Sequence, residues 1–273
     1  MTGTAQPVGD LLRDWRKRRR MSQLDLACEA EISQRHLSFI ESGRSSPSRD
    51  MLLHLSEQLA IPLRERNALL VAAGFAPMYR ERRSDDPALD AARAAIDVII
   101  TAHDPYPALA VDRHWTLVTA NKAVGHLIAG VDAKLLAPPV NVLRLSLHPA
   151  GLGPRIRNFR DWRAHVLSRL VRQIDNSADP VLIALIEELK GYPTPKAAMG
   201  RSAAAAHDFA GIVVPLELTS PNGVLSFFST TTVFGTPLDI GLSELAIESF
   251  FPADAATAEA MRRLAGAENS WAG

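Results

Sequence analysis

Residues 22–48 read SQLDLACEAEISQRHLSFIESGRSSPS and decide the fold of the first part of this 273-residue chain. Ser22 is a typical N-cap, and Asp25 three residues later makes a variant of the capping box. The sequence therefore predicts a short helix that begins at this cap and is barely two turns long. Its apolar residues are Leu24, Leu26, Ala27 and Ala30.

A second short helix is predicted after a tight turn. Ser33 is its expected N-cap, Leu37 and Ile40 are its inward positions, and Gly43 stands where a residue with positive φ ends a helix. Two short helices joined in this way form a helix-turn-helix, whose second helix enters the major groove of DNA.

Three further short helices complete a predicted five-helix unit. An amphipathic stripe marks the first of them, with Val8, Leu11, Leu12 and Trp15 on one face. A fourth helix is expected between residues 47 and 62, and a fifth over residues 64–73, where Gly74 ends it.

The outward face of the second motif helix is polar, and its residue types suit DNA. It carries Gln34, Arg35, Ser38 and Phe39, opposite the inward positions. Glutamine and arginine at the start of such a helix pair with adenine and guanine, respectively. A polar set able to bond phosphate oxygens follows the helix: Arg44, Ser45, Ser46 and Ser48.

Zero net charge conceals an uneven distribution of charge along the chain. Residues 1–83 hold 14 basic and 10 acidic side chains, whereas the remaining 190 residues hold 16 and 20. Five consecutive basic residues, 16–20, lie in the basic part, although a basic run alone is often a solvated surface. This segregation favours a module for an anionic partner joined to something else.

Composition excludes several other classes of protein. The single cysteine, Cys28, rules out an internal disulfide framework and any cysteine-rich zinc site. Residues 1–10 lack the features of a signal peptide, and the longest charge-free run, 218–238, is too polar and too broken for a membrane helix. The sequence contains no HExxH, GxSxG, P-loop or GxGxxG motif. We therefore expect a soluble cytoplasmic protein without enzymatic activity, metal or cofactor.

Residues 79–87 are highly charged and mark a boundary, after which the pattern changes to mixed α and β. The predicted elements are a hairpin over 108–119, helices over 162–174 and 180–189, strands over 212–218 and 224–234 around a turn at 220–223, a short strand at 244–248 and a terminal helix over 255–264. We predict a helix-turn-helix domain over 1–79, a linker over 80–92 and a second domain over 93–273. A helical linker through residues 88–100 is an equal alternative.

The N-terminal pattern resembles a known family. Residues 22–27, 32–44 and 47–48 look like the xenobiotic-response-element (XRE) type of helix-turn-helix, to which phage repressors and Cro belong. The resemblance covers about residues 8–74. It implies that Gln23 contacts phosphate, while Gln34, Arg35 and Phe39 approach bases.

The same resemblance implies an ion pair between Arg16 and Glu41 that links the first and third helices. The sequence departs from the family at Glu31, where many relatives have glycine. A residue with a side chain at that turn is expected to carry strain.

Two later stretches resemble sensor domains. Residues 108–121 look like the opening hairpin of a PAS-type sensor, and residues 234–239 and 247–254 are similar to the MmyB-like ligand-binding domain. This resemblance spans about residues 93–266. It implies a PAS-like antiparallel sheet with flanking helices that accommodates a fatty-acid-like or other small apolar ligand. The expected fold is thus an all-helical domain followed by an α+β domain.

Apolar residues of the predicted strands are candidates for lining a ligand cavity, although such residues commonly just fill a core. They are Phe209, Val213, Leu225, Phe227, Phe228 and Phe234. Phe227 and Phe228 are neighbours in a strand, so their side chains point to opposite faces. Leu225 shares the face of Phe227, whereas the polar Ser226 shares that of Phe228. We therefore expect Phe227 and Leu225 to point inward.

These features predict a transcriptional regulator that binds a specific double-stranded DNA operator and responds to a small apolar effector. A single reading helix covers few base pairs, so a homodimer on a pseudo-palindromic operator is expected. Two alternatives stay open. The second domain either only dimerises around a filled core, or binds haem or flavin as a PAS-like sensor.

Overall fold

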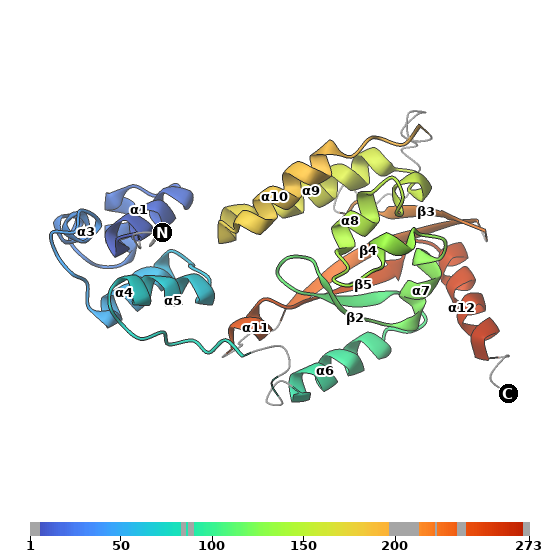
Figure 1. Ribbon diagram of the computed structural model, residues 1–273, viewed down its shortest axis with the longest axis horizontal. Helices are drawn as coiled ribbons and strands as arrows, with labels where there is room; N and C mark the ends of the chain where they lie inside the picture. Colours follow the sequence, from blue (N-terminus) through green and yellow to red (C-terminus); the bar gives the residue numbers. More distant parts are fainter. Residues whose placement is uncertain are drawn as a thin grey trace. The chain divides into compact units, whose positions relative to one another are not determined.

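The computed structural model describes residues 6–82, 86, 90–196, 213–221, 223–233 and 239–269 (Figure 1). The chain divides into two compact units, one built mainly from residues before 83 and one mainly from residues after it. Within the described residues, no helix combines the length and the apolar character needed to cross a bilayer.

Residues 6–82 form five helices. They are α1 (Val8–Arg18), α2 (Gln23–Glu29), α3 (Gln34–Glu41), α4 (Arg49–Gln58) and α5 (Leu63–Ala72). Ser22, Ser33 and Ser48 cap α2, α3 and α4, each accepting a hydrogen bond from the backbone amide three residues later. These bonds satisfy backbone donors that a helix start leaves free. The predicted caps at Ser22 and Ser33 are confirmed.

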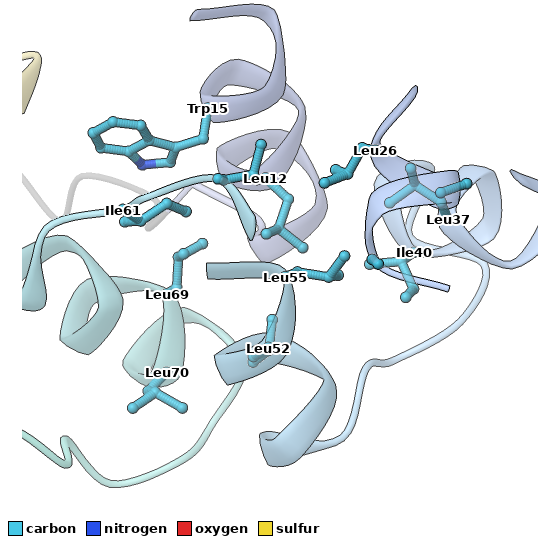
Figure 2. Packing of buried hydrophobic residues seen from close by; sticks show 13 residues of the cluster. Leu12, Trp15, Leu26, Leu37, Ile40, Leu52, Leu55, Ile61, Leu69 and Leu70 are labelled. Carbon is cyan, nitrogen blue, oxygen red and sulfur yellow. The ribbon is translucent and has the colours of Figure 1, made fainter. Parts of the chain in front are cut away.

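Apolar side chains from all five helices meet in one core (Figure 2). Leu12 of α1, Leu37 of α3 and Leu55 of α4 have no exposed surface. Full burial of a leucine side chain contributes roughly 1.5–3 kcal/mol. Helices α2 and α3 have only 7 and 8 residues, which is too short for a stable isolated helix. Burial in this core therefore holds the two motif helices in place.

The second unit contains a five-stranded antiparallel sheet. Its strands are β1 (Ala108–Val111), β2 (Leu117–Ala120), β3 (Leu216–Ser220), β4 (Gly223–Val233) and β5 (Ala246–Pro252). They lie in the order β2-β1-β5-β4-β3, so the last strand in sequence is the central one. The remaining helices of the described chain are α6 (Asp90–Thr101), α7 (Lys122–Ile128), α8 (Val142–Leu147), α9 (Phe159–Ser177), α10 (Pro180–Gly191), α11 (Ile240–Ser243) and α12 (Ala255–Asn269).

The two faces of the sheet meet different helices. On one face, Ile96 and Ile100 of α6 pack against Ala110 of β1 and Ile247 of β5. Because side chains alternate along a strand, Glu248 and the residues level with it point to the other face. Figure 1 shows α6 on one side of the sheet and α8 and α9 on the other.

The predicted fold class is confirmed: a helical unit precedes an antiparallel sheet with flanking helices. The hairpin β1–β2, helices α9 and α10, strand β4 and helix α12 lie close to where the sequence predicted them. Strand β3 pairs with β4 as predicted, but it begins at Leu216 and includes Ser220, whereas the sequence predicted a strand over 212–218. The last strand begins at Ala246 and runs further than predicted, because residues 249–252 continue to pair with β4. Helices α7 and α8 were not predicted.

Candidate functional site

The turn between α2 and α3 fixes the direction of the second motif helix. Glu31 in this turn has a φ of +52°, and Gly43 just after α3 has a φ of +72°. The left-handed region favours glycine, so Glu31 carries the strain that the sequence predicted, whereas Gly43 adopts its conformation without cost. Ile32 donates its amide to the Ala27 carbonyl and closes the turn.

A buried ion pair ties α3 to α1. The Arg16 Nε lies 2.6 Å from Glu41 Oε1, and its Nη2 lies 2.8 Å from Oε2, so the pair is bidentate. The Gln23 amide at the start of α2 also donates to Glu41 Oε2, at 2.9 Å. The ion pair implied by the XRE resemblance is confirmed. The same carboxylate now holds all three helices around the motif.

The surroundings of Glu41 favour its charged form. Burial alone raises the pKa of a carboxyl group, but hydrogen bonds from Arg16 and Gln23 and the charges of Arg16 and Arg13 outweigh it. The net effect holds the pKa of Glu41 below its ordinary value. The carboxylate therefore remains an acceptor for both side chains at neutral pH.

The outward face of α3 is open to solvent. Gln34 and Arg35 are exposed, whereas Ser38 and Phe39 are half-buried. The guanidinium of Arg35 lies 5.2 Å from the centre of the Phe39 ring, and that of Arg44 lies 5.9 Å from it. The Phe39 ring thus interacts with one arginine from the first turn of α3 and one from the segment after the helix.

The predicted phosphate-binding residues lie around this face, and some of them already form hydrogen bonds within the protein. Arg44, Ser46 and Ser48 are exposed. The Ser48 hydroxyl accepts from the Met51 amide as a helix cap, and its own proton can still be donated to another oxygen. The Gln23 amide group is engaged with Glu41, although an amide has a second N–H to donate. Chemically, the arrangement can offer donors to base edges and to phosphate oxygens.

A second candidate site is an apolar cavity in the sheet unit. Its volume is about 250 Å³, and it lies between the face of the sheet that carries Glu248 and helices α7, α8 and α9. Its walls come from residues as far apart in sequence as Pro107 and Phe250. The largest side chains in the wall are Trp115, Trp162 and Phe250, and most of the others are leucine or valine. Such a cavity suits an apolar ligand.

Charged groups in the wall of this cavity are paired. Arg169 of α9 forms a bidentate pair with Glu248 of β5, one arm of which joins Nη1 to Oε2 at 3.2 Å. Its Nη2 also donates to the Thr231 hydroxyl at 2.8 Å, and that hydroxyl donates to Glu248 Oε1 at 2.7 Å. The guanidinium lies 4.9 Å from the centre of the Trp115 ring.

Two other wall residues combine apolar surface with a polar contact. The Trp162 indole N–H donates to the Ser146 hydroxyl at 2.9 Å. The Trp162 ring is also stacked on His165, with ring centres 5.5 Å apart. Burial lowers the pKa of His165, and the charges of Arg169 and Arg172 lower it further. His165 is therefore neutral at neutral pH and adds no charge beside Trp162.

Three of the predicted ligand residues, Leu225, Phe227 and Val213, lie outside the cavity wall. Leu225 and Phe227 are buried on the same face of the sheet as the cavity, and Phe228 is on the opposite face, as the alternation predicted. Neither Leu225 nor Phe227 is among the residues that line the cavity, and neither is Val213. Phe227 instead packs edge-on against Phe250, which does line it, at 6.4 Å between ring centres.

Two other predicted ligand residues, Phe209 and Phe234, lie outside the described residues. Residues 6–82, 90–196 and the described parts beyond contain no cluster of three or more histidine, cysteine or carboxylate side chains that could hold a metal ion. The wall residues that sequence reasoning missed include Arg169 and Glu248. A glutamate in a mainly apolar strand was the available signal.

Comparison with known proteins agrees with this geometry. A family model described as the MmyB-like transcription regulator ligand binding domain matches residues 92–264, and one described as helix-turn-helix matches residues 12–66. The fold and these matches define a transcription regulator with a helix-turn-helix domain. The chain belongs to the family of MmyB-like transcription regulators, and both family resemblances of its sequence are confirmed.

Single proteins match this chain over smaller parts or at lower similarity than the family models do. A protein of Methanoculleus marisnigri named as an HTH-type transcriptional regulatory protein is 37% identical over 114 residues, which is 41% of this chain. The match spans 37% of the length of that relative. The solved structure of an RNA-binding light-oxygen-voltage receptor has 14% identity and a TM-score of 0.26, covering 95% of this chain and 64% of that one. This structural similarity is too low to bear on the fold.

Proposed function

We propose that this protein is a one-component regulator, not an enzyme. It binds a specific double-stranded DNA operator with α3 and adjusts that binding in response to a small apolar molecule. The observation that carries the proposal is the open face of α3, where exposed Gln34 and Arg35 stand on a helix fixed by the Arg16–Glu41 pair. A DNA-binding regulator of this kind acts in the cytoplasm.

The residues on and around the α3 face divide into those that contact base edges and those that bind phosphate. Gln34 and Arg35 read base edges in the major groove, because they are exposed at the N-terminal end of the helix. Ser38 and Phe39 approach bases or sugars behind them. The donors that bind phosphate oxygens and set the register are Gln23, Arg44, Ser46 and Ser48.

We divide the chain into a DNA-binding domain over 1–79, a linker over 80–92 and an effector domain over 93–273. The start of the effector domain is supported by α6, which packs on the sheet through Ile96 and Ile100, and by the family match from residue 92. Since one reading helix covers few base pairs, two copies of the chain bind a pseudo-palindromic operator as a homodimer.

The effector is a fatty-acid-like or other small apolar molecule that occupies the cavity in the effector domain. Support comes from the volume of about 250 Å³ and from walls made almost wholly of apolar side chains. Phe227 packs edge-on against the wall residue Phe250, and Leu225 is buried on the same face of the sheet. An apolar molecule that binds here would remove the apolar surface of the cavity wall from contact with water, which favours binding.

Selection of bound duplexes from genomic DNA tests the first part of the proposal. The selected operator then serves in gel shifts with Arg35→Ala. Loss of a paired base contact weakens specific binding by ~1–3 kcal/mol and relaxes the preference at one base position. Arg263→Ala, an exposed arginine of α12, is the matched control and should bind like the wild type. An unchanged base preference in Arg35→Ala rejects its role as a reader.

A second variant distinguishes phosphate contacts from base contacts. Arg44→Ala should weaken specific and non-specific duplexes about equally and lower the dependence of binding on salt by ~1 unit of slope, because a phosphate contact carries no base information. If the salt slope stays the same, Arg44 does not contact phosphate.

Mass spectrometry of lipid extracts from the purified protein tests the effector part. Val166→Phe places a ring in the cavity and should remove any co-purifying apolar molecule and the response of DNA binding to it. Overpacking can cost ~1–3 kcal/mol, so a thermal melt accompanies the variant. Val171→Phe, on an exposed position of the same helix, is the control. A folded Val166→Phe protein that still responds would show that the cavity is not the effector site.

A further inference from the structure

The polar groups of the cavity wall constrain the head group of the effector. Among the described residues that line the cavity, Arg169 and Glu248 are the ones that carry charge. They are bonded to each other in a bidentate arrangement, and the Thr231 hydroxyl bridges both. The two charges therefore cancel within the wall. The cavity offers a ligand no net positive and no net negative charge.

An ionised ligand would either break this arrangement or place an additional charge beside it. A carboxylate that took Arg169 as its partner would displace Glu248, whose side chain is only 5% exposed. A buried carboxylate without its partner is strongly unfavourable, and leaving it in place would put two like charges beside one guanidinium. An ammonium head group would compete with Arg169 for Glu248, because this carboxylate is already paired with the guanidinium. Its binding would therefore leave Arg169 without its partner or place two positive charges beside one carboxylate.

The wall does offer hydrogen bonding to an uncharged oxygen. The Ser146 hydroxyl uses a lone pair to accept from the Trp162 indole, so its own proton can be donated to a ligand. His165, stacked on Trp162, is neutral at neutral pH and adds no counter-charge. Ser146 and the Arg169–Glu248 pair belong to the same cavity.

We propose that the cavity selects an aliphatic molecule with an uncharged oxygen-bearing head, such as an alcohol, ester or lactone, over the ionised fatty acid of the same length. This inference rests on the proposed effector function and narrows it. The aliphatic body of the ligand is fatty-acid-like, and its head is not a carboxylate.

The test compares three probes of equal chain length, 1-decanol, decanoate and decylamine, on the full-length protein at neutral pH. Trp115 and Trp162 line the cavity, so tryptophan fluorescence reports occupancy, and calorimetry gives the affinity. We expect 1-decanol to bind at least about tenfold more tightly than either charged probe. Decanoate that binds as tightly as 1-decanol overturns the inference. If none of the three binds, the proposed effector function fails as well.

Two variants change the charge of the wall. Glu248→Gln keeps the shape and an acceptor for Arg169 but leaves a net positive wall, and it should raise the affinity for decanoate relative to 1-decanol by about tenfold. Arg169→Gln with Glu248→Gln removes both charges and should keep the preference for 1-decanol. Glu188→Gln breaks a similar bidentate pair with Arg144 on the surface and is the matched control, with wild-type preferences.

Circular dichroism establishes that each variant is folded. If Glu248→Gln fails to fold, the wild-type comparison of the three probes decides the inference alone. A folded Glu248→Gln protein whose preference is unchanged contradicts the argument from paired charges.

Discussion

Two bidentate arginine–glutamate pairs, one in each unit, differ in what surrounds them. Arg16 and Glu41 join α1 to α3, and Gln23 adds a third bond to the same carboxylate. Arg169 and Glu248 join α9 to β5 in the wall of a cavity. The arginine side chain is 10% exposed in the first pair and 20% exposed in the second.

The difference shows that the chemistry of an ion pair does not by itself set its role. The first pair is enclosed by protein, so it acts on the position of the recognition helix. The second lines a cavity of ligand size, and under the proposed effector function it would act on which molecules can enter. If this comparison is right, breaking the first pair changes stability most, and breaking the second changes ligand choice most.

The largest effect is expected for Arg16→Met. It leaves Glu41 buried and charged without its main partner, which costs ~3–5 kcal/mol in comparable sites. Hydrogen exchange under increasing denaturant, followed by mass spectrometry of peptides from α1 and α3, measures the free energy of unfolding of the first unit. Lys17→Met, the exposed neighbour, should change it little. If Arg16→Met and Lys17→Met changed the free energy of unfolding equally, the Arg16–Glu41 pair would not be what stabilises this unit.

A smaller loss is expected for Arg169→Met. The side chain is more exposed and its partner borders a cavity, so we expect a loss of ~1–3 kcal/mol in peptides from the sheet. Arg172→Met, an exposed residue of the same helix, is its control. A loss as large as that for Arg16→Met would mean that the cavity pair is chiefly structural.

The pKa of Glu41 predicts a pH effect confined to the first unit. A carboxyl whose folded-state pKa is lowered stabilises the fold fully above its unfolded value, about 4.3, and loses this contribution as the pH falls through the folded value. The free energy of unfolding should therefore drop more for the wild type than for Glu41→Gln between about pH 6 and about pH 3. Parallel curves for the two proteins would contradict this.

The smallest effect is expected at the motif turn. Glu31→Gly relieves a left-handed conformation worth ~1–2 kcal/mol but adds unfolded-state freedom worth ~0.4–1 kcal/mol, so a net stabilisation of ~0.5–1 kcal/mol is expected. Glu29→Gly, at the last residue of α2, should instead destabilise the same unit, because glycine is a poor helix former. Thermal melts of both variants measure the sign. Destabilisation by Glu31→Gly would show that its side chain, rather than its backbone, matters at the turn.

The first unit could be predicted closely because its signals are local. The caps at Ser22 and Ser33 and the positive φ of Gly43 each depend on residues within one helical turn. The burial of Leu37 and Ile40 follows from helical periodicity alone. Even the ion pair between Arg16 and Glu41 was predicted, because the caps, the turn and the core positions together identified the family resemblance that implies it.

The cavity could not be predicted in the same way. Alternation correctly separated Phe227 from Phe228, but it gives the face of a sheet and not which side chains reach a cavity. The walls depend on α7 and α8, which the sequence did not predict, and Arg169 meets Glu248 across 79 positions of sequence. Only the topology of the sheet brings such residues together.

The ring of Phe39 has a consequence for the entropy of association. Arginine side chains carry about 2 kcal/mol of rotamer freedom, much of which is lost when they are fixed on a ligand. Because Arg35 and Arg44 already lie over one aromatic ring, part of that freedom is surrendered when the domain folds. Less remains to be lost when the two guanidinium groups meet a duplex. Under the proposed function, Phe39 would thus favour the DNA-bound state by ordering both arginines in advance.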